Sequence, residues 1–278
     1  MIKKVLHLSF LYGIIIVVRL SLTQRKENTM NILIFDTETT DLNKCFCYNI
    51  GYVIANTTTN TILVKKDFVV EQIWHNLPLF STAYYSSKRP IYINRMKAKQ
   101  TKMVKYGYIC QEMIRDIKKY NVVSAYAYNS PFDEKVFNFN CDWFKCINPF
   151  DNIPIYDIRG FVHNGLIDND YLTFCERNNK FTESGNYSTT AETVFQYLTN
   201  DTDFIEEHTA LSDSLIEYYI LMKCVAKGKL NLLQDYPTKR SINRNVEKIL
   251  TVETKDNRYQ FKCNGYTIYK SKDLIKLK

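Results

Sequence analysis

The chain has 278 residues, of which 45% are hydrophobic and 14% aromatic, a composition expected of one ordinary globular domain plus extensions. Its net charge of +8 comes from the two ends, because residues 237–278 carry 11 Lys/Arg against 4 Asp/Glu and residues 1–29 carry 5 against 1. Subtracting both ends from the totals leaves 21 basic and 24 acidic residues, which excludes a uniformly basic surface over the middle of the chain.

Residues 1–29 have a basic start and an apolar run over residues 8–18. A run of this length is shorter than the roughly 18 to 20 residues that cross a bilayer, and no small-x-small cleavage site of a signal peptide follows it. A predicted strand follows Met30 at once, and residues 25–27 can be encoded by a purine-rich ribosome-binding sequence. We therefore interpret residues 1–29 as a misassigned upstream extension, with a membrane anchor as the alternative.

The elements of the main domain follow from residue periodicity. Residues 31–36 predict a buried strand, and residues 50–70 predict two more strands joined by a polar Thr/Asn turn, which makes an antiparallel meander. A helix over residues 98–119 is predicted to lead into a strand over residues 122–128. The later predictions are a helix with Ser130 as N-cap and Pro131 as its first residue, a short strand over residues 153–158, and helices over residues 189–198 and 210–227. Together they indicate an α/β domain over residues 30–230.

The C-terminal extension, residues 237–278, contains a hairpin signal over residues 259–270, two β-prone runs around an Asn-Gly turn. Lys262 and Lys270 alternate with aromatic residues there, a pattern that can hold single-stranded nucleic acid by stacking and phosphate contact. The alternative is a small hairpin whose aromatic residues pack on the main domain.

The eight cysteines form no CxxC pair and no Cys/His cluster at zinc spacing, and Cys45 and Cys47 are the two that lie closest in the sequence. We therefore expect reduced, mostly buried thiols in a cytoplasmic protein.

Acidic residues end the first predicted strand, in the stretch FDTETTDL. Asp36 and Glu38 are two residues apart and share one face of a strand, with about 7 Å of backbone between them. Their carboxylates repel each other unless a cation lies between them. The alternative for this stretch alone is a solvated turn.

Two further acidic positions stand at helix starts. Asp133, in YNSPFD, follows a strand and lies where open α/β sheets place their sites, although the helix macrodipole alone would also favour it. Asp213, in HTALSD, shares a helical face with Ile216 and Ile220, where a carboxylate is costly unless it is paired or bound to metal. His208, taken alone, reads as a polar surface residue.

The stretches FDTETTDL, YNSPFD and HTALSD, in this order, resemble the three motifs of the DEDDh family of 3′–5′ exonucleases: DxE, Asn-x-x-Phe-Asp and His-x4-Asp. This family includes the proofreading epsilon subunit of bacterial DNA polymerase III and RNA-trimming exonucleases. The resemblance covers roughly residues 31–227, and Thr209 stands where the sister family has Tyr. Two positions depart from the pattern, Asp41 for the usual Gly and Asn129 for a frequent His. The five site positions are occupied by Asp36, Glu38, Asp133, His208 and Asp213.

The resemblance implies an RNase H-like mixed sheet flanked by helices and two divalent cations, Mg²⁺ or Mn²⁺, bound by the four carboxylates. The two ions would clamp the attacking water and the leaving 3′ oxygen. His208 would act as general base, and Thr39, Thr40 and Leu42 would line the pocket of the terminal nucleotide. The predicted activity is the release of nucleoside 5′-monophosphates from the 3′ end of single-stranded DNA.

Three alternatives stay open: an RNA exonuclease of the same family, a nucleic-acid-binding protein without activity, and a nuclease tethered to a membrane by residues 1–29. A separate chain without a polymerase domain suits a bacterial or phage accessory exonuclease, with a polymerase or another replication protein as partner.

Overall fold

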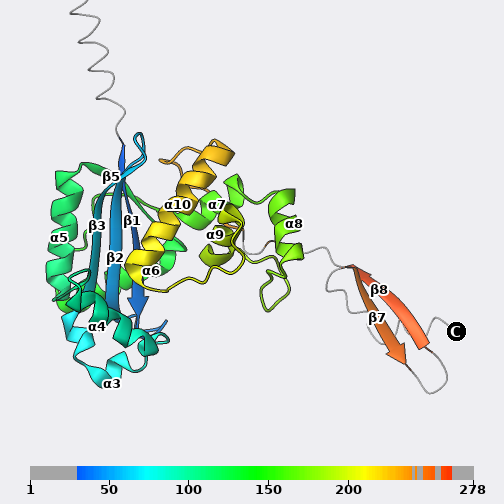
Figure 1. Cartoon of the computed structure of the whole chain (residues 1–278), viewed down its shortest axis with the longest axis horizontal. Helices are drawn as coiled ribbons and strands as arrows, with labels where there is room; N and C mark the ends of the chain where they lie inside the picture. The colour runs from blue at the N-terminus through cyan, green and yellow to red at the C-terminus, as the bar shows by residue number, and fades with distance from the viewer. Residues whose placement is uncertain (1–29, 240–241, 243–246, 254–257, 265–278) are drawn as a thin grey trace, which may run out of the picture. The chain divides into compact units, whose positions relative to one another are not determined.

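The computed structural model describes residues 30–239, 242, 247–253 and 258–264 (Figure 1). The chain divides into two compact units, one made of the residues up to 168 together with residues 189–238, and one made of residues 169–188 and 239–278. Residues 1–29, which we interpreted as an upstream extension or an anchor, lie outside the described residues. Within the described part of the chain, no helix has both the length and the apolar character needed to cross a membrane.

A six-stranded mixed sheet forms the first unit, in the order β4-β3-β2-β1-β5-β6. Strands β1 (Asn31–Thr39), β2 (Cys47–Asn56) and β3 (Thr61–Val70) are antiparallel neighbours. Strands β4 (Lys102–Val104), β5 (Val122–Ala127) and β6 (Ile155–Asp157) each pair in parallel with a neighbour. The antiparallel meander followed by alternating helices and strands is confirmed, and with it the α/β class.

The two faces of β1 meet different helices. Leu33 and Phe35 belong to a core that also contains residues of α5 (Tyr106–Lys119) and α6 (Ser130–Phe144). The alternate positions, which include Ile32 and Ile34, are fully buried and face the other way. Helix α10 (Ala210–Gly228) packs along β1 and β2 (Figure 1). Asp36 and Glu38 share the even-numbered face with Ile34.

The first unit contains further helices. They are α2 (Glu71–Trp74), α3 (Leu77–Phe80), the 3₁₀ turn η1 (Ser86–Lys88), α4 (Arg89–Lys97), α7 (Ile158–Gly165) and α9 (Ala191–Thr199). Of these, α7 and α9 pack on α10. The helix predicted over residues 189–198 is thus confirmed as α9, with Thr190 as its N-cap.

The prediction of one helix over residues 98–119 was wrong over residues 98–105. Residues 102–104 form β4, because they pair in parallel with the end of β3, and α5 starts only at Tyr106. The Thr101 hydroxyl donates to the buried carboxylate of Asp67 and so holds this turn against the sheet.

The predicted start of α6 was also wrong by one residue. Asn129, and not Ser130, is the N-cap, with a left-handed φ of 65° that Asn tolerates better than most residues. Its N–H donates to Asp157 Oδ1 at 2.9 Å, and Ser130 is already helical.

The second unit contains α8 (Asn169–Arg177) and the antiparallel pair β7 (Glu247–Glu253) and β8 (Arg258–Asn264). The first half of the predicted hairpin over residues 259–270 is a strand as expected, but β8 pairs with the preceding β7. The second half, with Lys270, lies outside the described residues. Tyr171 donates its hydroxyl proton to the Ser188 carbonyl at 2.8 Å, and Tyr187 forms an isolated bridge with Ile242.

Candidate active site

Three of the predicted carboxylates meet at one point. One carboxylate oxygen from each of Asp36, Glu38 and Asp213 lies within 4.8 Å of the other two. Asp36 and Glu38 come from the last part of β1, and Asp213 comes from the first turn of α10. Glu38 and Asp213 are buried, at 8% and 5% exposure. Asp213 follows Glu38 by 175 residues in the sequence, so only the packing of α10 on β1 brings these side chains together.

Asp133 approaches the same group from α6. It is buried, and its Oδ1 accepts a hydrogen bond of 2.6 Å from the Thr37 hydroxyl. Thr37 lies between the two acidic residues of β1, so this bond fixes the first turn of α6 beside them. The carboxyl group of Asp133 is near enough to Asp36 to raise the pKa of that residue.

The start of α10 is positioned by β2. The Asn49 side chain accepts a 2.9 Å hydrogen bond from the Ala210 N–H, one of the unpaired donors at the helix start. The Ser214 hydroxyl contacts the Gly51 carbonyl at 3.1 Å. A Cβ atom on Gly51 would lie 2.0 Å from the Leu211 nitrogen, so only glycine lets α10 approach this closely. These contacts place Asp213 over the end of β1.

Burial and mutual repulsion disfavour ionised carboxylates in the metal-free site. Burial, and then the nearby Asp133 and Glu206, raise the pKa of Asp36 well above its usual value. Burial and the Asp36 carboxylate raise the pKa of Asp213 to about 10 and that of Glu38 in the same direction. Burial raises the pKa of Asp133 to about 7, against the opposing hydrogen bond from Thr37. A bound cation would reverse these shifts by stabilising the charged forms.

Sequence reasoning missed two further carboxyl groups, Glu206 and Glu217. Burial, and then Glu192, raise the pKa of Glu206 to about 7. Glu217 is buried on α10, and burial followed by Asp36 raises its pKa well above the usual value. Glu217 stands one helical turn after Asp213, a spacing that places both on one face and could have identified it. Glu206 stands in a polar stretch without any such signal.

The carboxylate group fits divalent cations. Asp213 Oδ1 and Glu217 Oε2 are buried and have no hydrogen-bond partner among the described residues. A buried carboxylate oxygen without a partner is costly, and metal coordination would remove that cost. The donors are carboxylate oxygens, which suit Mg²⁺, Mn²⁺ or Ca²⁺ better than zinc.

His208 stands at the edge of this group, just before α10. Its ring stacks on the ring of Tyr85, with centroids 4.5 Å apart and an interplanar angle of 14°. Its Nδ1 lies 3.7 Å from Glu206 Oε2. Burial, and then the nearby ammonium of Lys88, lower the pKa of His208 below 6.5. The imidazole is therefore mainly neutral at pH 7 and able to accept a proton.

Lys88 and Tyr85, which sequence reasoning also missed, form the support of that ring. Lys88 Nζ donates to the Glu207 carbonyl at 2.5 Å and lies 4.1 Å from the centroid of the Tyr85 ring. Tyr85 and Lys88 come from the segment around η1, far in sequence from His208, and nothing in their local pattern indicates this contact.

The three predicted substrate-binding residues lie where β1 ends and differ in exposure. Leu42 is 73% exposed, and its carbonyl accepts a 2.8 Å hydrogen bond from Lys135 Nζ. Thr39 is half-buried and contacts the Asp41 carbonyl, whereas Thr40 is buried with its hydroxyl directed at Asp41. Their role in binding a nucleotide stays a prediction.

No protein family model and no curated protein matches this chain. Among solved structures, the nuclease domain of 3′hExo, described as a DEDDh family member bound to rAMP, has a TM-score of 0.49 and 16% identity, over 72% of this chain and 94% of that one. A 3′-exonuclease with 3′-end specific recognition of a histone mRNA stem-loop has a TM-score of 0.48 and 14% identity, over 84% and 91%. Exonuclease I of E. coli with a dA16 oligonucleotide has a TM-score of 0.42 and 14% identity, over 70% of this chain and 40% of that one.

Proposed function

We propose that this chain is a metal-dependent 3′–5′ exonuclease of the DEDDh type, which hydrolyses single-stranded DNA from its 3′ end and releases nucleoside 5′-monophosphates. The observation that carries the proposal is the convergence of Asp36, Glu38 and Asp213 within 4.8 Å, beside Asp133 and a histidine with a lowered pKa. All five residues occupy the motif positions from which the activity was predicted.

The four carboxylates Asp36, Glu38, Asp133 and Asp213 would hold two divalent cations, Mg²⁺ or Mn²⁺. When bound, such ions polarise the scissile phosphate and lower the pKa of a bound water. The protein contributes rigidity, because Thr37 fixes Asp133 and β2 fixes the start of α10. A preorganised charge cluster of this kind acts without rearrangement during the reaction.

His208 is the proposed general base. The lowered pKa keeps its imidazole neutral at pH 7, and the stacked Tyr85 ring limits its rotation. It would take the proton of the attacking water as the bond to phosphorus forms. Glu206, 3.7 Å from Nδ1, is placed to stabilise the imidazolium that results.

Leu42 is the proposed contact for the terminal base. Its apolar side chain is 73% exposed beside the end of β1, where it would stack on the base of the departing nucleotide. Thr39 would contribute through the backbone and hydroxyl of the same turn, and the buried Thr40 would hold that turn in place through its hydroxyl bond to Asp41. RNA is the alternative substrate, and it differs at the 2′-hydroxyl group that this pocket would meet.

The test is degradation of matched 5′-labelled single-stranded DNA and RNA in Mg²⁺, Mn²⁺ or chelator. The proposal predicts a ladder of products shortened one nucleotide at a time from the 3′ end, with DNA degraded faster and no activity in chelator. The variant Asp213→Asn should be inactive, whereas Asp142→Asn, an exposed position on α6, should keep full activity. Internal cleavage or full activity of Asp213→Asn would contradict the proposal. Faster degradation of RNA than of DNA would mean that RNA is the substrate.

A further inference from the structure

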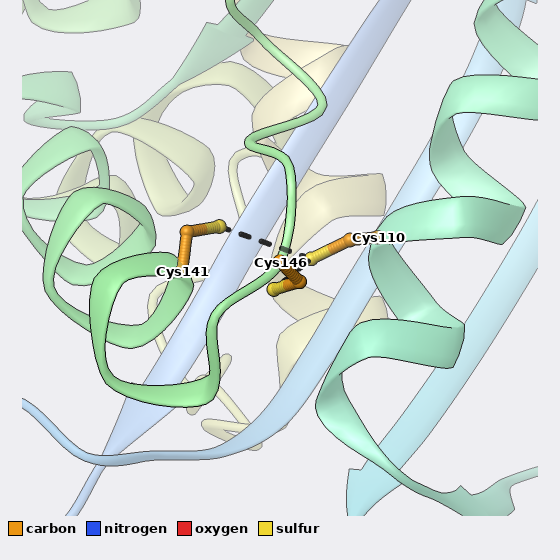
Figure 2. A group of neighbouring side chains, drawn as sticks. All are labelled: Cys110, Cys141 and Cys146. Atoms are coloured by element: carbon orange, nitrogen blue, oxygen red, sulfur yellow. Dashed lines mark hydrogen bonds between the residues drawn. The ribbon is translucent and has the colours of Figure 1, made fainter.

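Three cysteines that are dispersed in the sequence meet in the core on the side of the sheet covered by α5 and α6. Figure 2 shows Cys110 on α5, Cys141 near the end of α6, and Cys146 in the segment that follows α6. One sulfur from each lies within 4.8 Å of the other two. Cys110 and Cys141 are buried, at 1% and 5% exposure, and Cys146 is half-buried. We refer to these three residues as the thiol cluster.

The turn at the end of α6 brings Cys146 to Cys141. Lys145 ends the helix in a left-handed conformation with a φ of 55°. This turn lets the Cys146 N–H donate to the Cys141 carbonyl at 3.0 Å. The chain thus reverses over the helix end, and Cys110 closes the group from α5.

The sulfur separations match those of thiolates that share one metal ion. Cys110 Sγ lies 3.9 Å from Cys141 Sγ and 3.7 Å from Cys146 Sγ. Two thiolates bound to one tetrahedral zinc ion at about 2.3 Å lie about 3.8 Å apart. None of the three cysteines is disulfide-bonded, so all three sulfurs are available as ligands. The backbone therefore already holds the separations that a metal ion requires.

A buried hydroxyl group lies beside the cluster. Tyr106 is fully buried, and its hydroxyl makes no hydrogen bond of normal geometry among the described residues. It interacts with the Cys141 thiol, which is a weak acceptor. A metal-bound thiolate is a stronger hydrogen-bond acceptor than a thiol, so an ion in the cluster would strengthen this contact.

We propose that the thiol cluster is a binding site for a soft, thiophilic metal ion, Zn²⁺ or Cu⁺, held by Cys110, Cys141 and Cys146. Three sulfur ligands suit Cu⁺ directly, and Zn²⁺ would take a water as fourth ligand on the half-exposed side at Cys146. Binding displaces the thiol protons into solvent, because the thiolate is the ligand. The ion would join α5 to α6, the helix that carries Asp133 at its other end.

This site is independent of the exonuclease proposal, because its sulfur donors differ from the carboxylates that bind Mg²⁺. The test titrates the reduced full chain with Zn²⁺ or Cu⁺ in excess Mg²⁺, which occupies the carboxylate site. Cd²⁺ serves as a spectroscopic probe, since thiolate-to-metal charge transfer reports sulfur ligands. We expect one equivalent bound through thiolates and a rise in melting temperature. Competition against a chelator decides between Zn²⁺ and Cu⁺.

Two variants separate a metal site from three thiols that merely share the core. Cys146→Ser removes a half-buried ligand and should weaken binding by more than the about 10- to 100-fold that an outer-shell change costs. Cys224→Ser, a buried thiol outside the cluster, is the matched control and should bind normally. Tyr106→Phe removes only the hydroxyl beside the Cys141 thiol, which is a weak acceptor, so the metal-free fold should lose little stability while affinity falls about 10- to 100-fold.

Equal binding by wild type, Cys146→Ser and Tyr106→Phe would overturn the proposal. So would the absence of a charge-transfer band with Cd²⁺ in protein whose thiols are shown to be reduced.

Discussion

Replacing Asp213 with Asn has opposite expected effects on the metal-free and the metal-loaded protein. In the metal-free fold the pKa of Asp213 is about 10, because the carboxyl is buried next to Asp36. An unfolded Asp titrates near 3.8. Protonating this carboxyl at pH 7 therefore costs about 4 kcal/mol on folding. Asn has no charge to neutralise, so Asp213→Asn should raise the free energy of unfolding in chelator by up to about 4 kcal/mol.

The sign of the pH dependence follows from the raised pKa. Well below pH 3.8 Asp213 is protonated in both the folded and the unfolded protein, so replacing it with Asn removes no cost of proton uptake. Above that pH the unfolded carboxyl ionises while the folded one stays protonated, and wild type loses stability as pH rises towards the folded pKa. The advantage of Asp213→Asn should therefore grow by about 1.4 kcal/mol per pH unit between pH 5 and 7.

Urea denaturation of both proteins at pH 5, 6 and 7, first in chelator and then in Mg²⁺, measures these differences. In Mg²⁺ the order should reverse, because wild type gains binding free energy that the variant has lost. Asp142→Asn, exposed on α6, should match wild type throughout. An Asp213→Asn variant that is less stable than wild type in chelator at pH 7, or a difference that does not change with pH, would show that burial does not raise the pKa of Asp213 in the fold.

Three further predictions concern the groups around the carboxylates. His208→Ala should lower kcat by about 10²- to 10⁴-fold. The wild-type rate should fall with a midpoint below pH 6.5, because the pKa of His208 is lowered from that value. A fall centred above pH 7 would exclude His208 as the base. Tyr85→Ala should reduce kcat up to about tenfold by removing the ring stacked on His208, with Mg²⁺ affinity unchanged. Tyr85→Phe keeps the ring and should keep the rate. Equal rates in wild type and Tyr85→Ala would show that the stack is unimportant. Gly51→Ala should cost about 3 kcal/mol or more on thermal or urea unfolding, because its Cβ would meet the backbone of Leu211; wild-type stability would mean that α10 lies further from β2.

Local patterns were sufficient to predict most of the sheet and the main acidic positions. The apolar run before Asp36 predicts β1, and a period of two predicts that Asp36 and Glu38 share a face. The start of α10 and the polar-to-apolar change at residue 210 place Asp213 in a first helical turn. These features depend on neighbours within one or two turns, which the sequence displays directly.

Features that depend on distant residues were missed or misplaced. Residues 102–104 have helical apolar spacing with the residues that follow, but pairing with the end of β3 makes them a strand. The contact between Tyr85 and His208 joins segments 123 residues apart, with no shared local pattern.

The thiol cluster shows the same limit. Cys110 and Cys141 are 31 residues apart, too far for any short metal-binding spacing, and only the contact of α5 with α6 brings them together.

The carboxylates at the end of β1 and at the starts of α6 and α10 are proposed to form a site for divalent cations. Titration of the metal-free chain with Mn²⁺, with the free ion followed by electron paramagnetic resonance, measures this binding without any reaction step. We expect two Mn²⁺ ions per chain in the presence of a nucleoside 5′-monophosphate, and a loss of at least one ion in Asp213→Asn. The same Mn²⁺ binding by both proteins, or no binding by wild type, would contradict the proposed site.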